Sequence, residues 1–192
     1  MNLSGIFYYL GKINILIVFF SLVNLLYCYY FEFKINLEIY FYTFLISFLF
    51  YLITFKIKFK KKNFRTNNLI LFSILGWIIL PFVMSLPFWL GGYSNFLDSY
   101  FETVSGFTSF GASIFFNKIN ILDPPILLWR SSTQVVGSIF FIMTIILVFG
   151  NRAINIYPLK FITKKKDTVY FSLNFEKVFN NTVYAYVIIF LI

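Results

Sequence analysis

Histidine is absent from these 192 residues, and cysteine occurs once, at Cys28. The absence of histidine excludes the catalytic triads and zinc sites that depend on an imidazole side chain. A single cysteine excludes an internal disulfide and a cysteine-ligated metal cluster. Cys28 lies inside an apolar run, where a thiol packs as a small apolar side chain. The sequence therefore favours a function that uses neither histidine nor thiol chemistry.

Charged residues are scarce as well, at 12% of the chain, whereas hydrophobic residues make up 60% and aromatic residues 24%. The mean hydropathy is +0.82, which is far above that of a soluble domain. A hydrocarbon core of about 30 Å needs roughly 20 apolar residues per helix, so the chain has room for about four or five crossings. The composition therefore predicts an all-α integral membrane protein.

Four complete apolar segments are predicted to cross the bilayer, and a fifth begins near Val178. The four predicted spans are residues 13–31, 37–55, 69–90 and 125–150. Pro81 is expected to kink the third span and Pro87 to end it. From Val178 to Ile192 a helix rises only about 22 Å, less than the roughly 30 Å of hydrocarbon. The sequence therefore looks truncated within its fifth span.

Basic residues gather in the connections that follow the second and fourth spans. They are Lys56, Lys58, Lys60, Lys61, Lys62 and Arg65 in the first, and Arg152, Lys160, Lys164, Lys165, Lys166 and Lys177 in the second. Cytoplasmic loops carry such an excess, so we expect both connections and the N-terminus on the cytoplasmic side of the inner membrane. This placement explains the net charge of +9 without nucleic acid, and membrane lipid is the expected partner. Trp89 and Trp129 are expected in the external aromatic belt.

The connection between the third and fourth spans contains a polar segment with two glycines. Residues 96–104, preceded by capping-type residues, are predicted to form a half-helix that runs inward from the external face. Its C-terminal end carries partial negative charge, which favours a dehydrated cation. Gly106 and Gly111 can adopt positive φ angles, so that consecutive carbonyl oxygens replace the hydration shell of an alkali cation. Three acidic residues are expected at the external mouth: Asp98, Glu102 and Asp123.

Two other interpretations stay open from the residues alone. Glycines and hydroxyl residues between two helices are also typical of an ordinary external loop. A membrane scaffold or enzyme is the other class, although the predicted spans contain no acid–base pair, nucleophile–base set or metal constellation. The segment therefore indicates a conduction path without establishing it.

Residues 98–113, DSYFETVSGFTSFGAS, resemble the first pore loop of Trk-type potassium uptake proteins, whose pattern runs roughly D-x-x-F-E-x-x-S-G-[FL]-T-T-T-G-A-[ST]. The likeness extends to residues 85–88, SLPF, before the loop and to residues 128–134, LWRSSTQ, after it. Phe110 stands where the family often has a third threonine, and residues 135–138, VVGS, replace its tryptophan and paired glycines. These departures leave the ion preference open.

The resemblance implies a fold of four fused helix–pore loop–helix repeats around one potassium path. Residues 69–150 would form the first repeat, after two extra transmembrane helices and a basic loop in residues 1–68. Residues 151–192 would form a cytoplasmic linker and the start of the second repeat. The filter-forming residues would act through main-chain carbonyls: Thr108, Ser109, Phe110, Gly111 and Ala112. Four further residues would line the pore mouth or support the loop: Asp98, Glu102, Gly106 and Arg130.

Arg130 has two interpretations, since near a span end it either extends toward the interface or pairs with a pore-loop carboxylate such as Glu102.

The expected function is therefore potassium uptake across the cytoplasmic membrane, with K⁺ held by the backbone of Thr108, Ser109, Phe110 and Gly111. No covalent cofactor and no enzyme activity are expected, and Na⁺ or H⁺ is the candidate coupling ion. The resemblance also implies a homodimer and a cytosolic nucleotide-binding regulatory subunit. The alternatives are a short chain whose copies assemble into a cation channel, and a remnant that conducts nothing.

Overall fold

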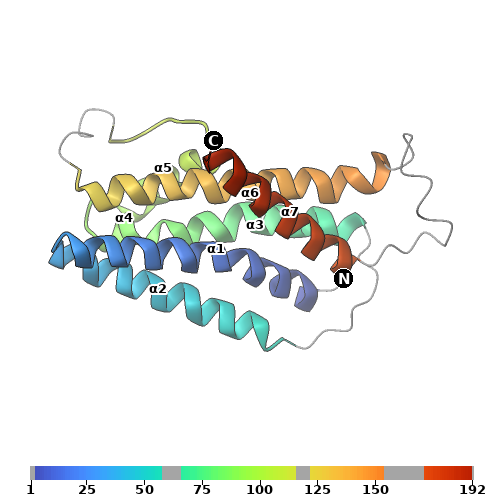
Figure 1. The fold of residues 1–192 in the computed structure, drawn as a ribbon, viewed down its shortest axis with the longest axis horizontal. Coiled ribbons are helices and arrows are strands. Elements are labelled where there is room, and N and C mark those ends of the chain that lie inside the picture. The colour runs from blue at the N-terminus through green and yellow to red at the C-terminus, as the bar shows by residue number, and fades with distance from the viewer. Residues whose placement is uncertain (1–2, 58–65, 116–121, 154–170, 192) are drawn as a thin grey trace.

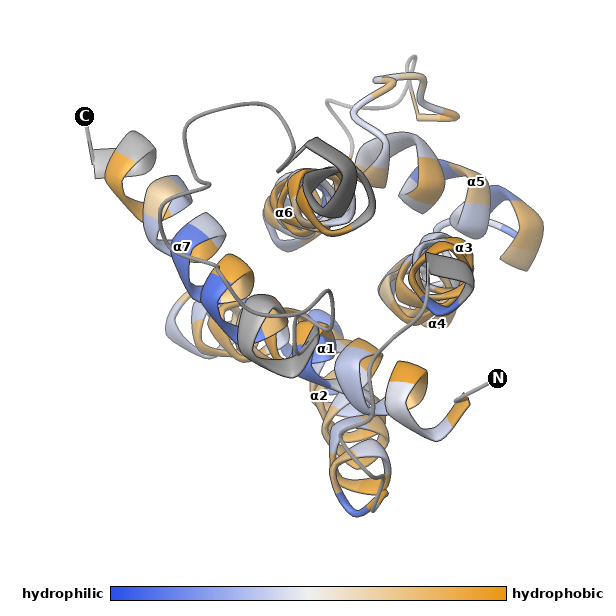
Figure 2. Cartoon of the chain, turned by 90° about the vertical axis from the view of Figure 1, so that its right-hand side faces the viewer, coloured by the Kyte–Doolittle hydropathy of each residue, from blue (hydrophilic) through white to orange (hydrophobic). Residues whose placement is uncertain are grey.

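The computed structural model describes residues 3–57, 66–115, 122–153 and 171–191, and the secondary structure in these ranges is helical, without strands. The helices are α1 (Leu3–Tyr30), α2 (Lys34–Phe55), α3 (Thr66–Met84), α4 (Leu86–Leu90), α5 (Phe96–Phe107), α6 (Pro124–Ala153) and α7 (Phe171–Leu191). The long helices α1, α2, α3 and α6 lie side by side, and the short α5 packs against α3 and α6 (Figures 1 and 2).

Four helical segments in the described ranges are long and apolar enough to cross a membrane. They are Leu3–Tyr30, Lys34–Phe55, Asn68–Leu90 and Pro124–Leu147. Each contains most of one predicted span, because a run of about 20 apolar residues stabilises a helix in lipid. The prediction of an all-α membrane fold is therefore confirmed.

The fifth predicted span differs from the structure. α7 begins at Phe171 rather than near Val178, and it is not among the four candidate spans. Lys177, Asn180 and Asn181 are exposed on it, and Figure 2 shows hydrophilic stretches along α7. Its ion pair with α1, between Lys12 Nζ and Glu176 Oε1 at 2.5 Å, ties it to the bundle.

The ends of the helices are arranged as the predicted orientation requires. Figure 1 places the C-terminal ends of α2 and α6 at the same end of the bundle as the N-terminal ends of α1, α3 and α7. The two basic connections start from α2 and α6, and the described ends of these two helices lie on one side. Most of their basic residues fall in 58–65 and 154–170, outside the described residues, and the orientation itself stays a prediction.

A seam of small and polar residues joins α1 to α2. Both helices bury small or polar residues: Gly11, Asn14, Ser21, Asn24 and Cys28 on α1, and Asn36, Tyr40, Thr43, Ser47 and Thr54 on α2. A Cβ on Gly11 would overlap the side chain of Thr54, and Asn14 Nδ2 donates to the Ser47 carbonyl at 2.7 Å. Small residues let membrane helices approach closely, so α1 and α2 form a tight hairpin.

The third span is broken near its C-terminal end. α3 contains Pro81 and ends at Met84, and α4 starts at Leu86 with Pro87 in its first turn. The prediction that Pro87 ends the span is wrong, because a proline in a first turn needs no N–H partner and is well placed to start a helix. Trp129 Nε1 donates to the Met84 carbonyl at 2.9 Å, at this break. Trp129 is completely buried, so its predicted place in the aromatic belt is also wrong.

Candidate ion site

The predicted pore-loop region begins with α5, which is longer than predicted. It extends from Phe96 to Phe107 instead of ending at Val104, with Asn95 as its N-cap. Asp98 is exposed in the first turn, where a carboxylate interacts favourably with the N-terminal end of the helix dipole. The opposite face of α5 is buried, and its members are Ser99, Glu102, Thr103, Ser105, Gly106 and Phe107.

The chain reverses direction directly after α5. Thr108 ends the helix, and both its N–H and its Oγ1 donate to the Val104 carbonyl at 2.9 Å. Ser109 has a φ of 56° and Gly111 a φ of 81°, both in the left-handed region. Positive φ is therefore confirmed for Gly111. It is wrong for Gly106, which lies within α5 and packs against Thr133 on α6.

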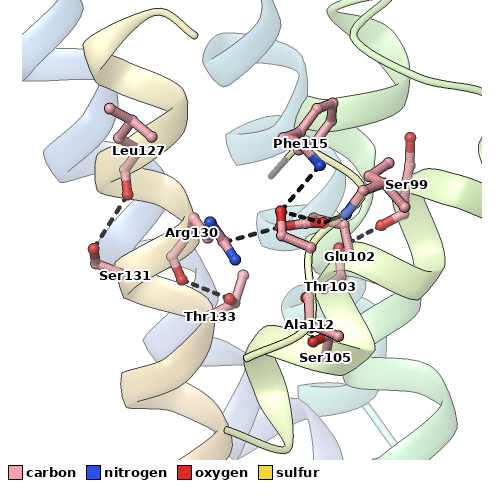
Figure 3. A network of polar contacts seen from close by, with 12 residues as sticks. Ser99, Glu102, Thr103, Ser105, Ala112, Phe115, Leu127, Arg130, Ser131 and Thr133 are labelled. Atoms are coloured by element: carbon pink, nitrogen blue, oxygen red, sulfur yellow. Dashed lines mark hydrogen bonds and ion pairs between the residues drawn. The ribbon is translucent and has the colours of Figure 1, made fainter. Parts of the chain in front are cut away.

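After this turn the chain returns along α5 in the opposite direction. Ser105 Oγ donates to the Ala112 carbonyl at 2.5 Å, near the turn. One helical turn further back, the Glu102 carboxylate accepts hydrogen bonds from Ser113 Oγ, at 2.9 and 3.0 Å, and from the Ile114 N–H at 2.9 Å. Figure 3 shows these contacts between α5 and the returning segment of the chain. Polar side chains of α5 thus fix both ends of the segment 112–114.

The same carboxylate pairs with Arg130 on α6. Arg130 Nε lies 2.8 Å from Glu102 Oε1 (Figure 3), and the Glu102 side chain is completely buried while that of Arg130 is 20% exposed. Of the two interpretations of Arg130, the pairing with Glu102 is confirmed. A buried carboxylate needs such partners, and here the guanidinium, a hydroxyl and a main-chain N–H supply them.

Packing against α6 places the turn beside the middle of that helix. A Cβ on Gly106 would overlap Thr133, and a Cβ on Gly137 would overlap the Phe107 carbonyl oxygen. Thr133 and Gly137 lie about 14 to 20 Å along α6 from its start, at a rise of about 1.5 Å per residue. The Phe107 ring also meets Trp77, inside α3, at 5.2 Å between ring centroids. The turn therefore lies beside the middle of α6 and not beyond the ends of the helices.

Four residues at the turn are exposed: Thr108, Ser109, Phe110 and Gly111. The Phe110 ring is 77% exposed. Ala112 is half-buried, and its carbonyl accepts the bond from Ser105. Of the five predicted filter residues, the first four therefore share an exposed turn, and Ala112 lies at its edge against α5.

A second polar cluster, next to the start of α6, was not predicted. Tyr93, in the link between α4 and α5, donates its hydroxyl to Asp123 Oδ2 at 2.5 Å and lies 2.9 Å from Asn36 Oδ1. Asn36 Nδ2 also lies 3.3 Å from Asp123 Oδ2. Burial is the largest cause that raises the pKa of the Tyr93 phenol well above its ordinary value, and the Asp123 carboxylate raises this pKa further. The three residues come from separate segments, so no sequence pattern relates them.

Comparison with known proteins finds a partial match. Over 101 residues, 52% of this chain, the sequence is 30% identical to a protein of Methanocaldococcus jannaschii described as an uncharacterized cation transporter. The matched region is 21% of that protein, so the chain spans about a fifth of its relative's length. No family model matches the chain. No solved structure matches it either.

Proposed function

We propose that this chain is part of a cation transporter that takes up K⁺ across the cytoplasmic membrane through main-chain carbonyls of its pore loop. The observation that carries the proposal is the position, along the length of α6, at which the chain reverses direction after α5. α5 ends beside the middle of α6, and the turn that follows is exposed at residues 108–111. Non-helical backbone at membrane depth is tolerated where it lines water or is buried in protein.

The electrostatics of the turn favour a cation. The C-terminal end of α5 carries partial negative charge and is followed directly by Thr108. Main-chain carbonyl oxygens replace the hydration shell of K⁺, and the left-handed residues Ser109 and Gly111 change the direction of successive peptide groups. Glu102 is paired with Arg130, so its role in this proposal is to hold the loop rather than to bind the ion.

Two likenesses support the choice of function. The relative in Methanocaldococcus jannaschii is described as a cation transporter, and residues 98–113 resemble a Trk-type pore loop. One pore loop forms one side of a path, so we propose that further repeats of the same chain or other copies complete it. The intact mass of the gene product, compared with 22.8 kDa for these residues, separates the two sources.

The remaining parts of the proposal rest on two arguments: the apolar composition and the basic connections support the lipid surroundings and the orientation, and the Trk-type resemblance implies the coupling ion and the assembly. Lipid surrounds the apolar spans, the N-terminus lies in the cytoplasm, and the protein acts as a transporter and not as an enzyme. Na⁺ or H⁺ is the proposed coupling ion. A homodimer with a cytosolic nucleotide-binding regulatory subunit is the proposed assembly.

Gly111 and Gly92 form a matched pair for the test. Both have positive φ, 81° and 67°, and a Cβ added to either would meet no atom within 4 Å. Gly92 lies in the external link before α5, away from the turn. The full gene product should be expressed in a host that lacks potassium uptake, with growth at low K⁺ and Rb⁺ influx as readouts.

We expect Gly111→Asp to abolish growth and influx, and Gly92→Asp to retain both at equal protein amounts in the membrane. Rb⁺ influx by Gly111→Asp at the wild-type rate would refute the assignment of the turn. A wild-type protein that supports neither growth nor influx would refute potassium transport itself.

A further inference from the structure

The N-terminal hairpin makes polar contacts with the start of α6. Tyr40 on α2 is completely buried, and its hydroxyl donates to the Pro125 carbonyl at 2.9 Å. One turn earlier on α2, Asn36 contacts Asp123, the residue before α6. Asp123 also accepts from Tyr93, in the link that leads into α5. Three separate segments therefore meet at the external end of α6.

The first turns of α6 are held from a second side as well. The Tyr40 ring lies 5.6 Å from that of Trp129, which donates to the Met84 carbonyl at the end of α3. Trp129 is completely buried between these partners. The position of this part of α6 is therefore set by α2 and α3 together.

The next residue of α6 contacts the pore loop. Arg130 pairs with Glu102, and Glu102 binds Ser113 and Ile114, directly after the exposed turn. A series of buried and partly buried contacts thus connects Tyr40 on the hairpin to the returning chain behind residues 108–111. A helix transmits such a constraint because its internal hydrogen bonds keep its residues in fixed relative positions.

We propose that the α1–α2 hairpin is a brace for the pore loop, and that Tyr40 and Asn36 are positioning residues for ion discrimination. This inference rests on the proposed cation transport. Carbonyl oxygens distinguish cations of different size only when the surrounding protein controls where they lie. The hairpin suits this role, because the seam with Gly11 against Thr54 and Asn14 against Ser47 holds its helices close together.

Tyr40→Phe removes the hydroxyl bond to Pro125 and keeps the ring against Trp129. Its matched control is Tyr42→Phe, on the same helix, where the tyrosine side chain is 55% exposed. The readouts are the KM for Rb⁺, the inhibition constant of Na⁺ against Rb⁺ influx, and the amount of protein in the membrane. Tyr93→Phe serves as a second variant, since it breaks the contact with Asp123 from another segment.

We expect Tyr40→Phe and Tyr93→Phe to change the ratio of the two constants by up to about tenfold, the factor that corresponds to the free energy of one hydrogen bond, with Tyr42→Phe unchanged. A hairpin needed only for folding would lower the amount of protein and leave the ratio constant, and that result would overturn the brace.

Hydrogen–deuterium exchange separates the brace from the transport proposal. Amides of residues 108–115 should exchange faster in Tyr40→Phe than in Tyr42→Phe, whatever ion the protein carries. Equal exchange in the two variants would contradict the brace even if potassium uptake is measured. Faster exchange without any Rb⁺ influx by the wild type would keep the brace and refute the transport function.

Discussion

Arg130 and Glu102 form an asymmetric ion pair, in which the carboxylate is completely buried and the guanidinium side chain is one-fifth exposed, with 2.8 Å between Arg130 Nε and Glu102 Oε1. Removing Arg130 leaves a buried charge without its counter-ion, whereas removing the charge of Glu102 leaves a guanidinium that reaches solvent. Removing Arg130 and removing the charge of Glu102 should therefore lower the free energy of unfolding by different amounts.

We predict that Arg130→Gln lowers the free energy of unfolding by about 3 to 5 kcal/mol, and that Glu102→Gln lowers it by less. The double variant should lose less than the two single losses added together, because it leaves no unpaired charge. Cys28, the single cysteine and completely buried, allows unfolding to be followed with a thiol-reactive dye in detergent. Simple additivity in this double-mutant cycle would contradict the coupling.

Gly137 is predicted to be essential for seating α5 on α6. Alanine there would place a Cβ against the main-chain carbonyl of Phe107, which cannot move without shifting the end of α5. Gly137→Ala should cost about 1 to 3 kcal/mol of stability, typical of overpacking, and should reduce cation uptake. The control is the adjacent Ser138→Ala, which removes only a bond within α6 to the Gln134 carbonyl. Equal thermal stability and uptake in the two variants would argue against this close contact.

Ser109 holds a left-handed conformation without being glycine, at a φ of 56°. This conformation costs an L-residue roughly 1 to 2 kcal/mol, so Ser109→Gly should retain uptake and stability. Ser109→Val should lose both, because a β-branched side chain is strongly disfavoured there. Glu32, between α1 and α2, has a similar φ of 58°, and Glu32→Val is the control. Both valine variants should lose stability, but only Ser109→Val should lose Rb⁺ influx when the two variants are compared at equal protein amounts in the membrane.

Tyr93 should make stability depend on alkaline pH. Burial raises the pKa of its phenol above the ordinary value in the folded protein, so the folded state disfavours ionised tyrosine. The stability that the neutral phenol contributes is fully present below about pH 10 and is lost as pH rises through the folded-state pKa. The unfolding temperature, measured by circular dichroism from pH 8 to 11, should fall less steeply with pH in Tyr93→Phe than in the wild type. Identical slopes would mean that Tyr93 ionises equally in both states.

Much of the architecture could be predicted from the residues alone. Each long helix is specified by a run of apolar residues, since crossing a bilayer needs both length and internally satisfied backbone groups. The half-helix, the reversal and the pairing of Glu102 with Arg130 could also be predicted, because they depend on glycines, caps and charges that lie within about 36 residues of one another, from residue 95 to residue 130. The predicted filter assignment awaits the transport experiments.

The tertiary structure alone decided which faces of these helices meet. A helix that is apolar nearly all round carries little periodic signal, so the sequence did not show that Trp129 is buried or that Tyr40 reaches Pro125. The close contact at Gly137 and the meeting of Asn36 with Asp123 likewise depend on the rotation and depth of helices far apart in the chain. The local sequence determined that the helices and the loop exist, whereas long-range packing determined where the exposed turn lies and what holds it there.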